Sequence, residues 1–181
     1  MPARMEGVFI KSQLQSSTLL LKGCPLFAGL SETELNWLLP LTKPEFCCYQ
    51  KGDLVAAWGE PTRPGIVAEG VIISTLTMDS EPSRVLEVLE QGNLCGVDAV
   101  FSCAGICPTN LIADAKSSIL FFDLLEPLEQ AEPELKAHLM SNASRFLAAR
   151  SVKLLCRVET LIVENFSEPA ATAPKAISGE V

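Results

Sequence analysis

Between Glu45 and Asp123 the chain alternates short β-rich runs with turn signals, and this alternation restricts the fold more than any other feature. The runs are EFCCY, DLVAAW, GIVAEG, VIISTLTM, RVLEVLE and SILFFD, and the turns between them include KGD, GEP, MDSEP and QGN. Strands this short and this regularly interrupted are typical of a sandwich or a barrel. We therefore expect a mainly β domain of one of these kinds.

Helical patterns flank the β-rich part. Upstream, the run SSTLLLKGCPLFAGL is helical in character and breaks at its GCP, and Ser31 with Glu34 forms a capping-box pattern. This pattern predicts a short amphipathic helix that ends at Pro40. Downstream, from about Pro133, more than thirty residues contain no glycine and no further proline, and their spacing predicts one long helix with an apolar stripe.

The length of this helix favours a dimer. Thirty residues at about 1.5 Å each span roughly 45 Å, which is more than one face of a small barrel can cover. The helix can fold back onto its own barrel or pair with a second copy, and the length favours pairing as a parallel, coiled-coil-like homodimer. The interface residues expected from the stripe are Leu135, Leu139, Phe146, Ala149, Leu154, Val158 and Leu161.

Composition excludes several classes of protein. The net charge is −8, which argues against general affinity for nucleic acid because phosphate contacts need clustered Lys and Arg. No apolar run approaches the roughly 20 residues that a membrane span requires. The N-terminus lacks the apolar core and cleavage site of a signal peptide, so we expect a cytoplasmic protein.

The seven cysteines contain no C-x-x-C pair. We expect them to be small, reduced core residues, because free cysteine is among the most buried residue types. The alternative is a thiol sensor or a set of iron–sulfur ligands formed by Cys95, Cys103 and Cys107.

Catalytic motifs are lacking in the sequence. Metalloenzymes built on cupin-like barrels need two or three histidines and a carboxylate inside the barrel, whereas the one histidine, His138, falls on the long helix. No G-x-S-x-G, P-loop or dinucleotide-binding glycine motif occurs either. The sequence therefore predicts neither an enzyme nor a metal site, and it implies no cofactor.

Six motifs in order resemble the effector domain of the Crp/Fnr family of bacterial transcription regulators. They are CPLFAGLSETELNWL, YQKGDLVAAWGEP, GIVAEGVI, VLEQGNLCGVDAVF, PTNLIADAKSSILFFD and the long helix. The resemblance covers Pro25 to Leu161 and implies a cyclic-nucleotide-binding-like β-roll, which is a double-stranded β-helix jelly roll of the cupin type. It divides the chain into an N-terminal helical extension (1–22), the β-roll (23–130), a dimerisation helix (131–165) and a disordered tail (166–181).

The resemblance also places a phosphate-binding cassette in the segment 91–114. Cyclic-nucleotide sites of the family pair a glutamate, which holds the ribose, with an arginine, which neutralises the phosphate. Here Val97 stands directly after Gly96 at the glutamate position, and the segment CPTN (107–110) contains no arginine. A cyclic phosphate would be left unpaired, so we expect no conventional binding of cyclic AMP or cyclic GMP.

Three alternatives remain for this cassette. Backbone amides of Gly96–Ala99 can accept a weak anion, polar side chains can hold an uncharged ligand, or the cassette is degenerate and simply packed. Counting along the long helix, the resemblance also brings Arg150 and Ser151 to the pocket, where Arg150 would supply the missing cation or, alternatively, pair at the surface with an acidic neighbour. The candidate ligand-binding residues are therefore Gly96, Val97, Asp98, Ala99, Pro108, Thr109, Asn110, Arg150 and Ser151.

Family members follow the dimer helix with a winged helix-turn-helix domain. Seventeen residues follow Glu164, too few for that domain, so we expect no specific DNA binding by this chain alone. The leading hypothesis is a homodimeric domain that senses an unidentified small molecule for a Crp/Fnr-type regulator. The alternatives are a DNA-free protein that pairs with related regulators, and the redox sensor described above.

Overall fold

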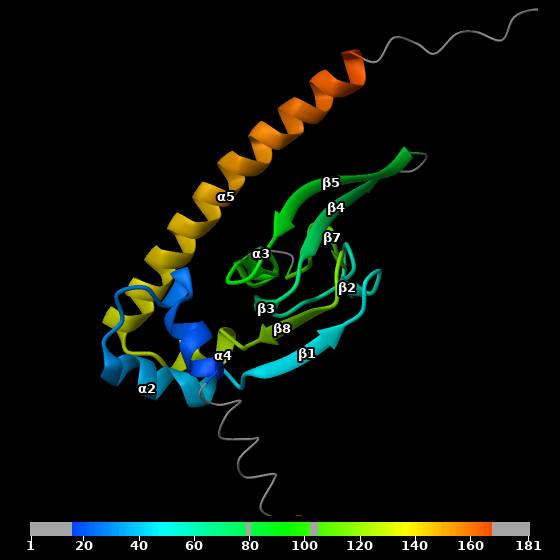
Figure 1. Cartoon of the computed structure of the whole chain (residues 1–181). Coiled ribbons are helices and arrows are strands. Elements are labelled where there is room, and N and C mark those ends of the chain that lie inside the picture. The colour runs from blue at the N-terminus through cyan, green and yellow to red at the C-terminus, as the bar shows by residue number, and fades with distance from the viewer. Residues whose placement is uncertain (1–15, 79–80, 102–104, 168–181) are drawn as a thin grey trace, which may run out of the picture.

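The computed structural model describes residues 16–78, 81–101 and 105–167. Within these ranges the strands form two antiparallel four-stranded sheets that face each other as a β-roll (Figure 1). The first sheet has the order β1 (Glu45–Tyr49), β8 (Ser117–Phe121), β3 (Gly65–Glu69) and β6 (Leu94–Cys95). The second has the order β2 (Leu54–Ala56), β7 (Asn110–Ala113), β4 (Ile72–Met78) and β5 (Glu81–Leu89). The predicted jelly-roll class of fold is confirmed.

Two apolar cores hold this architecture together. One core lies between the sheets and includes Val67, Ile72 and Ile119, all essentially without exposure. The other lies between the outer side of the first sheet and the helices, where the rings of Phe27 and Phe122 stand 5.7 Å apart. The roll is therefore packed on both sides of its first sheet, and the helical elements are part of the same folded body.

The short helices of the N-terminal part are those that the sequence predicts, with one correction. Residues 16–22 are helical, followed by η1 (Pro25–Phe27) and α2 (Glu32–Leu41). The capping box is present, since the Ser31 amide donates to Glu34 at 2.7 Å and the Glu34 amide donates to the Ser31 hydroxyl at 3.3 Å. The prediction that Pro40 ends this helix is wrong, because Pro40 lies inside its last turn. Proline has no amide to donate to the carbonyl of Asn36, and Asn36 is an exposed residue.

The predicted long helix is present as α5 (Pro133–Ser167), 35 residues without a break, after the short α4 (Leu125–Gln130). Its first half packs on η1, where the Asn142 amide donates to the carbonyls of Leu26 at 3.1 Å and Ala28 at 2.9 Å. Its second half rises beside the β4–β5 hairpin (Figure 1). The tail predicted for 166–181 begins inside this helix, and from residue 168 it lies outside the described residues, as do residues 1–15 of the predicted N-terminal extension.

Two glycines are required by close approach of the backbone. Gly70 has φ +86°, and a Cβ there would lie 2.3 Å from the Ser117 hydroxyl. Gly96 has φ +69°, and a Cβ there would lie 2.4 Å from the carbonyl oxygen of Arg63. Both positions combine a left-handed backbone with a steric limit that only glycine satisfies. Gly96 thereby sets the turn from which the cassette helix starts.

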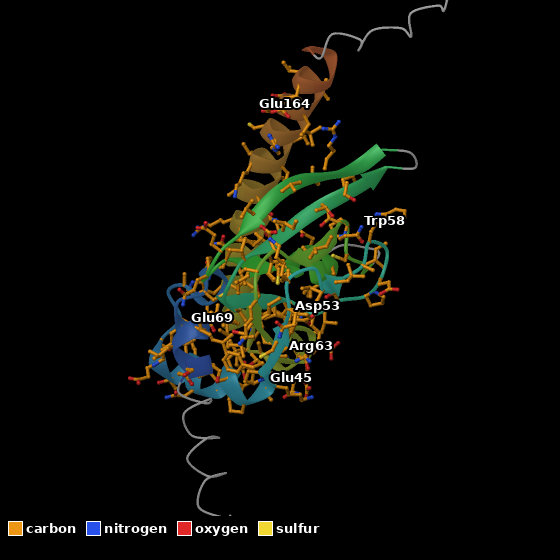
Figure 2. The ribbon with its side chains drawn as sticks, turned by 45° about the vertical axis from the view of Figure 1, so that its right-hand side comes forward. Glu45, Asp53, Trp58, Arg63, Glu69 and Glu164 are labelled. Carbon is orange, nitrogen blue, oxygen red and sulfur yellow. The ribbon has the colours of Figure 1, made fainter. Side chains whose placement is uncertain are left out.

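The loop that carries Arg63 is itself anchored. The Arg63 guanidinium forms ion pairs with Glu45 at 3.0 Å and Asp123 at 2.9 Å, and it donates to the Lys43 carbonyl at 3.1 Å. Figure 2 shows Arg63 and Glu45 at the end of the molecule opposite Glu164, which lies far along α5. The cassette turn therefore contacts a loop that is tied to one end of the first sheet, where β1 begins and β8 ends. In the part of the chain described, no helix is long and apolar enough to cross a bilayer.

Candidate effector-binding site

Helix α5 inserts Arg150 into the roll. Only 7% of this residue is exposed, and its Nε donates to the Glu87 carboxylate at 2.9 Å while Nη1 donates to the Asp98 carboxylate. Lys153, one turn further along the helix, lies 3.4 Å from the other oxygen of Glu87. Two carboxylates from the roll thus bind two cations from α5, which connects the helix to the cassette and to β5.

The Arg150 guanidinium stays charged in this position. Burial lowers its pKa, but Asp98 and Glu87 raise it by charge and hydrogen bonding, and the balance lies above the ordinary value. The Glu87 side chain is 6% exposed and the Asp98 side chain 25% exposed. Glu87 is therefore the interior partner of Arg150, and Asp98 is the partner nearer to solvent.

Glu87 reaches this site because of its place in the second sheet. It pairs across the sheet with Ser74 on β4, whose hydroxyl lies 2.7 Å from the hydroxyl of Thr109. Glu87 also alternates in phase with Leu89, which is buried between the sheets. The charge therefore occupies a position that faces the interior of the roll, among buried hydroxyl groups.

The cassette helix α3 (Val97–Phe101) presents one polar side chain to Arg150. Asp98 belongs to its first turn, whereas Val97 and Ala99 are 0% and 2% exposed. Val97 packs in the core between the first sheet and the helices. The position that the resemblance assigns to the ribose-binding carboxylate is thus an apolar core residue, and Gly96 acts through the turn that it forms.

In residues 107–110, Cys107 and Asn110 form side-chain hydrogen bonds within the protein. The Cys107 thiol donates to the Thr109 carbonyl at 3.0 Å, and the Asn110 side-chain oxygen accepts from the Trp58 amide at 2.8 Å. Pro108 is exposed. Thr109 contacts Ser74, the cross-strand neighbour of Glu87, while Asn110 holds the loop that carries Trp58.

Of the residues that the sequence predicts for the site, some lie together and others lie apart. The structure brings Asp98 and Arg150 into contact, as an ion pair inside the roll. Ser151 lies elsewhere, because it is exposed and its hydroxyl donates to the Leu147 carbonyl at 2.8 Å, back along its own helix. Sequence reasoning missed Glu87, Ser74 and Lys153. The available signal was the in-phase position of Glu87 with Leu89 in the run RVLEVLE, which predicts a charge on the interior face of a strand.

The cysteines near the cassette are buried among apolar groups. Burial raises the pKa of the Cys95 thiol to about 12, and it also raises the pKa of Cys107. Both thiols are therefore protonated at neutral pH, a state that neither attacks oxidants nor ligates a metal readily. Cys103, the third residue of the redox alternative, lies outside the described residues. Among those described, no group of three histidine, cysteine or acidic side chains is placed to bind a metal ion.

The residues predicted for a dimer interface divide between the core and the surface. Leu135 and Leu139 are 7% and 3% exposed and belong to the core of the chain itself, against which Phe146 also packs. Leu154 and Leu161 are half-buried, and Ala149 is exposed. The large apolar side chains left exposed on the described second half of α5 are Val152, Leu155, Val158, Ile162 and Val163.

Within this exposed set, Leu155, Val158 and Ile162 follow one another at steps of three and four residues, the spacing of a coiled-coil seam. Of the sequence-predicted residues, Val158 alone is among them. The seam that the fold leaves open is therefore rotated around the helix from the stripe expected from the sequence. His138, the histidine of α5, lies beside Gly29 and outside the roll, with its ring 3.2 Å from the position of a Cβ at Gly29.

Comparison with known proteins identifies the fold. No protein-family model and no curated protein matches the sequence. Solved structures that match include the catabolite activator protein of Thermus thermophilus (22% identity, TM-score 0.60, 76% of this chain and 62% of that one). They also include the sensor domain of the transcriptional regulator DNR from Pseudomonas aeruginosa (22% identity, TM-score 0.58, 74% of this chain and 91% of that one). A third is a cyclic nucleotide-binding domain from Methylobacillus flagellatus (12% identity, TM-score 0.66, 82% of this chain and 84% of that one).

The matches to single domains span nearly the whole of those domains, whereas the chain spans 62% of the length of the Thermus activator. Identities of 22% or lower establish the fold and leave function to the site itself. The chain has the fold shared by cyclic nucleotide-binding domains and by the sensor domains of transcription regulators.

Proposed function

We propose that this chain is the effector-sensing domain of a Crp/Fnr-type transcription regulator, that it acts as a homodimer through α5, and that cyclic AMP is not its effector. The observation that carries the proposal is the buried contact of Arg150 with Asp98 on α3 and Glu87 on β5. This contact joins the cassette to the helix that presents the exposed seam. A conformational change in the cassette is therefore transmitted through Arg150 to α5 and to the proposed dimer interface.

The proposed mechanism is a shift between two placements of α5. A polar effector that engages the cassette competes for Asp98, which is the more exposed partner of Arg150. Glu87 and Lys153 keep the helix attached while the Asp98 contact changes. An effector can bias the helix only by its difference in affinity for the two placements, and helix shifts at interfaces are a common form of such transitions.

Cyclic nucleotides are poor candidates for this effector. Val97 offers no hydrogen bond to a ribose, and Arg150 already donates to Asp98 on the cassette side. A cyclic phosphate bound on the cassette side of Arg150 would have to displace Asp98. The displaced Asp98 carboxylate would then be left unpaired beside the anion, which is unfavourable.

We expect calorimetric titration with cyclic AMP or cyclic GMP to give no saturable heat, corresponding to a Kd weaker than about 1 mM. Circular dichroism of the same protein sample checks in parallel that the protein is folded. Micromolar binding of either nucleotide would contradict this expectation. Loss of such binding in Arg150→Lys, which keeps the charge but not the planar donor geometry, would then identify Arg150 as the phosphate ligand.

The coupling between cassette and helix is tested by Asp98→Asn. Removing this charge weakens the Arg150 contact on the cassette side, and we expect the two α5 helices of a dimer to change their separation by at least about 1–2 Å. The separation is measured by electron–electron double resonance between spin labels on Cys156, which is exposed. The labelled protein carries Cys47→Ser, Cys48→Ser and Cys103→Ser, because Cys47 is half-buried and Cys48 exposed, so that the labels are restricted to α5.

Asp114→Asn is the matched control for this experiment. Asp114 forms an exposed ion pair with Lys51 at 3.3 Å, away from α5, so its neutralisation should leave the distance distribution unchanged. An unaltered distribution in Asp98→Asn, with the dimer intact, would remove the proposed coupling.

A further inference from the structure

A cavity of about 250 Å³ lies between α5 and the turn that joins β5 to β6. Its apolar wall includes Leu89, Leu94 and Phe146, and no cassette residue from 96–99 or 107–110 lines it. The volume is below the range of about 300–1,000 Å³ that is common for pockets of drug-sized ligands. The cavity therefore lies against the start of the cassette segment, at Gly92–Leu94, and away from α3, and it is suited to a small molecule with an apolar body.

Arg150 lines this cavity and retains an unused donor group. Its Nε is bound to Glu87 and its Nη1 to Asp98, whereas Nη2 makes no hydrogen bond or ion pair with any residue that the structure describes. A guanidinium carries five N–H donors. Nη2 is not one of the buried side-chain atoms that lack a partner in the described part of the chain, so it is accessible and can donate to an acceptor bound in the cavity that Arg150 lines.

Two further donors stand at the same cavity. The Lys153 side chain is 66% exposed and its ammonium lies 3.4 Å from Glu87. Asn93 also lines the cavity; its side-chain oxygen accepts from the Glu90 amide at 3.0 Å, and its NH₂ group supplies donors. Arg150, Lys153 and Asn93 therefore surround the apolar wall with hydrogen-bond donors.

The charges at the cavity favour one negative charge on the ligand. Two cations and one carboxylate, Glu87, line it, so positive charge is in excess on this side. Asp98 binds the opposite side of the guanidinium and does not line the cavity. The two cations that line the cavity exceed its one carboxylate by a single charge, so a monoanion is compensated there and a dianion is not.

We propose that this cavity binds a small monoanion with an apolar body, of the aryl or branched alkyl carboxylate class. The carboxylate lies between Arg150 Nη2 and Lys153 Nζ, and the apolar body packs against Leu94 and Phe146. Planar carboxylates suit a guanidinium because the two groups match in geometry. The site does not include the candidate ligand-binding residues 96–99 and 107–110, and the proposal holds whether or not the chain senses an effector through those residues.

Benzoate is the probe, and benzamide is its uncharged match in shape. Titration of the ¹⁵N-labelled protein should shift the backbone amide resonances of Gly92, Asn93 and Leu94, while those of Gly96–Ala99 move little. Benzamide should leave all of these amide resonances unshifted. Lys153→Gln should weaken benzoate binding by about tenfold, since hydrogen bonds with charged groups are the stronger ones, and Lys136→Gln, exposed on the same helix and outside the cavity, should not.

Each part of this experiment can overturn the proposal. Equal shifts with benzamide would show that the charge is not recognised. Shifts centred on Gly96–Ala99 would place the anion in the cassette instead, which concerns the proposed effector site and not this cavity. An unchanged affinity of Lys153→Gln for benzoate would show that Lys153 does not bind the carboxylate, which contradicts the proposal.

Discussion

Arg150→Met is expected to lower the free energy of unfolding by about 3–5 kcal/mol, the cost of leaving one partner of a buried ion pair uncompensated. Methionine keeps much of the length and apolar volume of the arginine stem, so the loss is mainly electrostatic. The Glu87 side chain is 6% exposed and would retain only Lys153, at 3.4 Å. Urea denaturation followed by circular dichroism measures the difference.

The matched control is Arg145→Met. Arg145 is exposed on the same helix, and its replacement should change stability by less than about 0.5 kcal/mol. Adding Glu87→Gln to Arg150→Met should recover much of the loss, because the second change removes the unpaired buried charge. A loss below about 1 kcal/mol in Arg150→Met would mean that water reaches Glu87 and that the ion pair does not fasten α5.

Leu155→Asp is expected to convert a dimer into a monomer. The unchanged chain should sediment at about twice 19.5 kDa. Leu155 is 65% exposed in one chain, and burial of such a side chain in a seam contributes about 1.5–3 kcal/mol per copy. A charge at both copies should therefore weaken association at least about a hundredfold, as measured by analytical ultracentrifugation across a range of concentrations.

Leu19→Asp is the control for this change. Leu19 is 71% exposed, but it lies in the helical residues 16–22 and not on α5, so its replacement should leave the mass unchanged. Phe146 is a less informative position, because it packs against the core of its own chain and its replacement by aspartate would also destabilise the fold. A monomer at high micromolar concentration in the unchanged chain would remove the dimer proposal.

The sequence by itself determined the class of fold. Turn-bounded runs between Glu45 and Asp123 became the strands of two sheets, and the uninterrupted segment after Pro133 became α5. These features depend on local preferences and on glycine and proline, which act over a few residues. The absence of a glutamate after Gly96 and of an arginine in 107–110 was equally visible, since a motif is local in sequence.

Only the tertiary structure decided which charges meet and which face of α5 stays open. Arg150 pairs with Glu87, 63 residues away in sequence, and no local pattern selects one carboxylate among many for such a pairing. An apolar stripe likewise predicts that one face of a helix is buried. It does not show whether the β-roll of the same chain or a second chain buries that face. Leu135 and Leu139 pack inside the chain, whereas Leu155 and Ile162 remain exposed. That distinction depends on long-range packing, because the same hydrophobic free energy is gained against either surface.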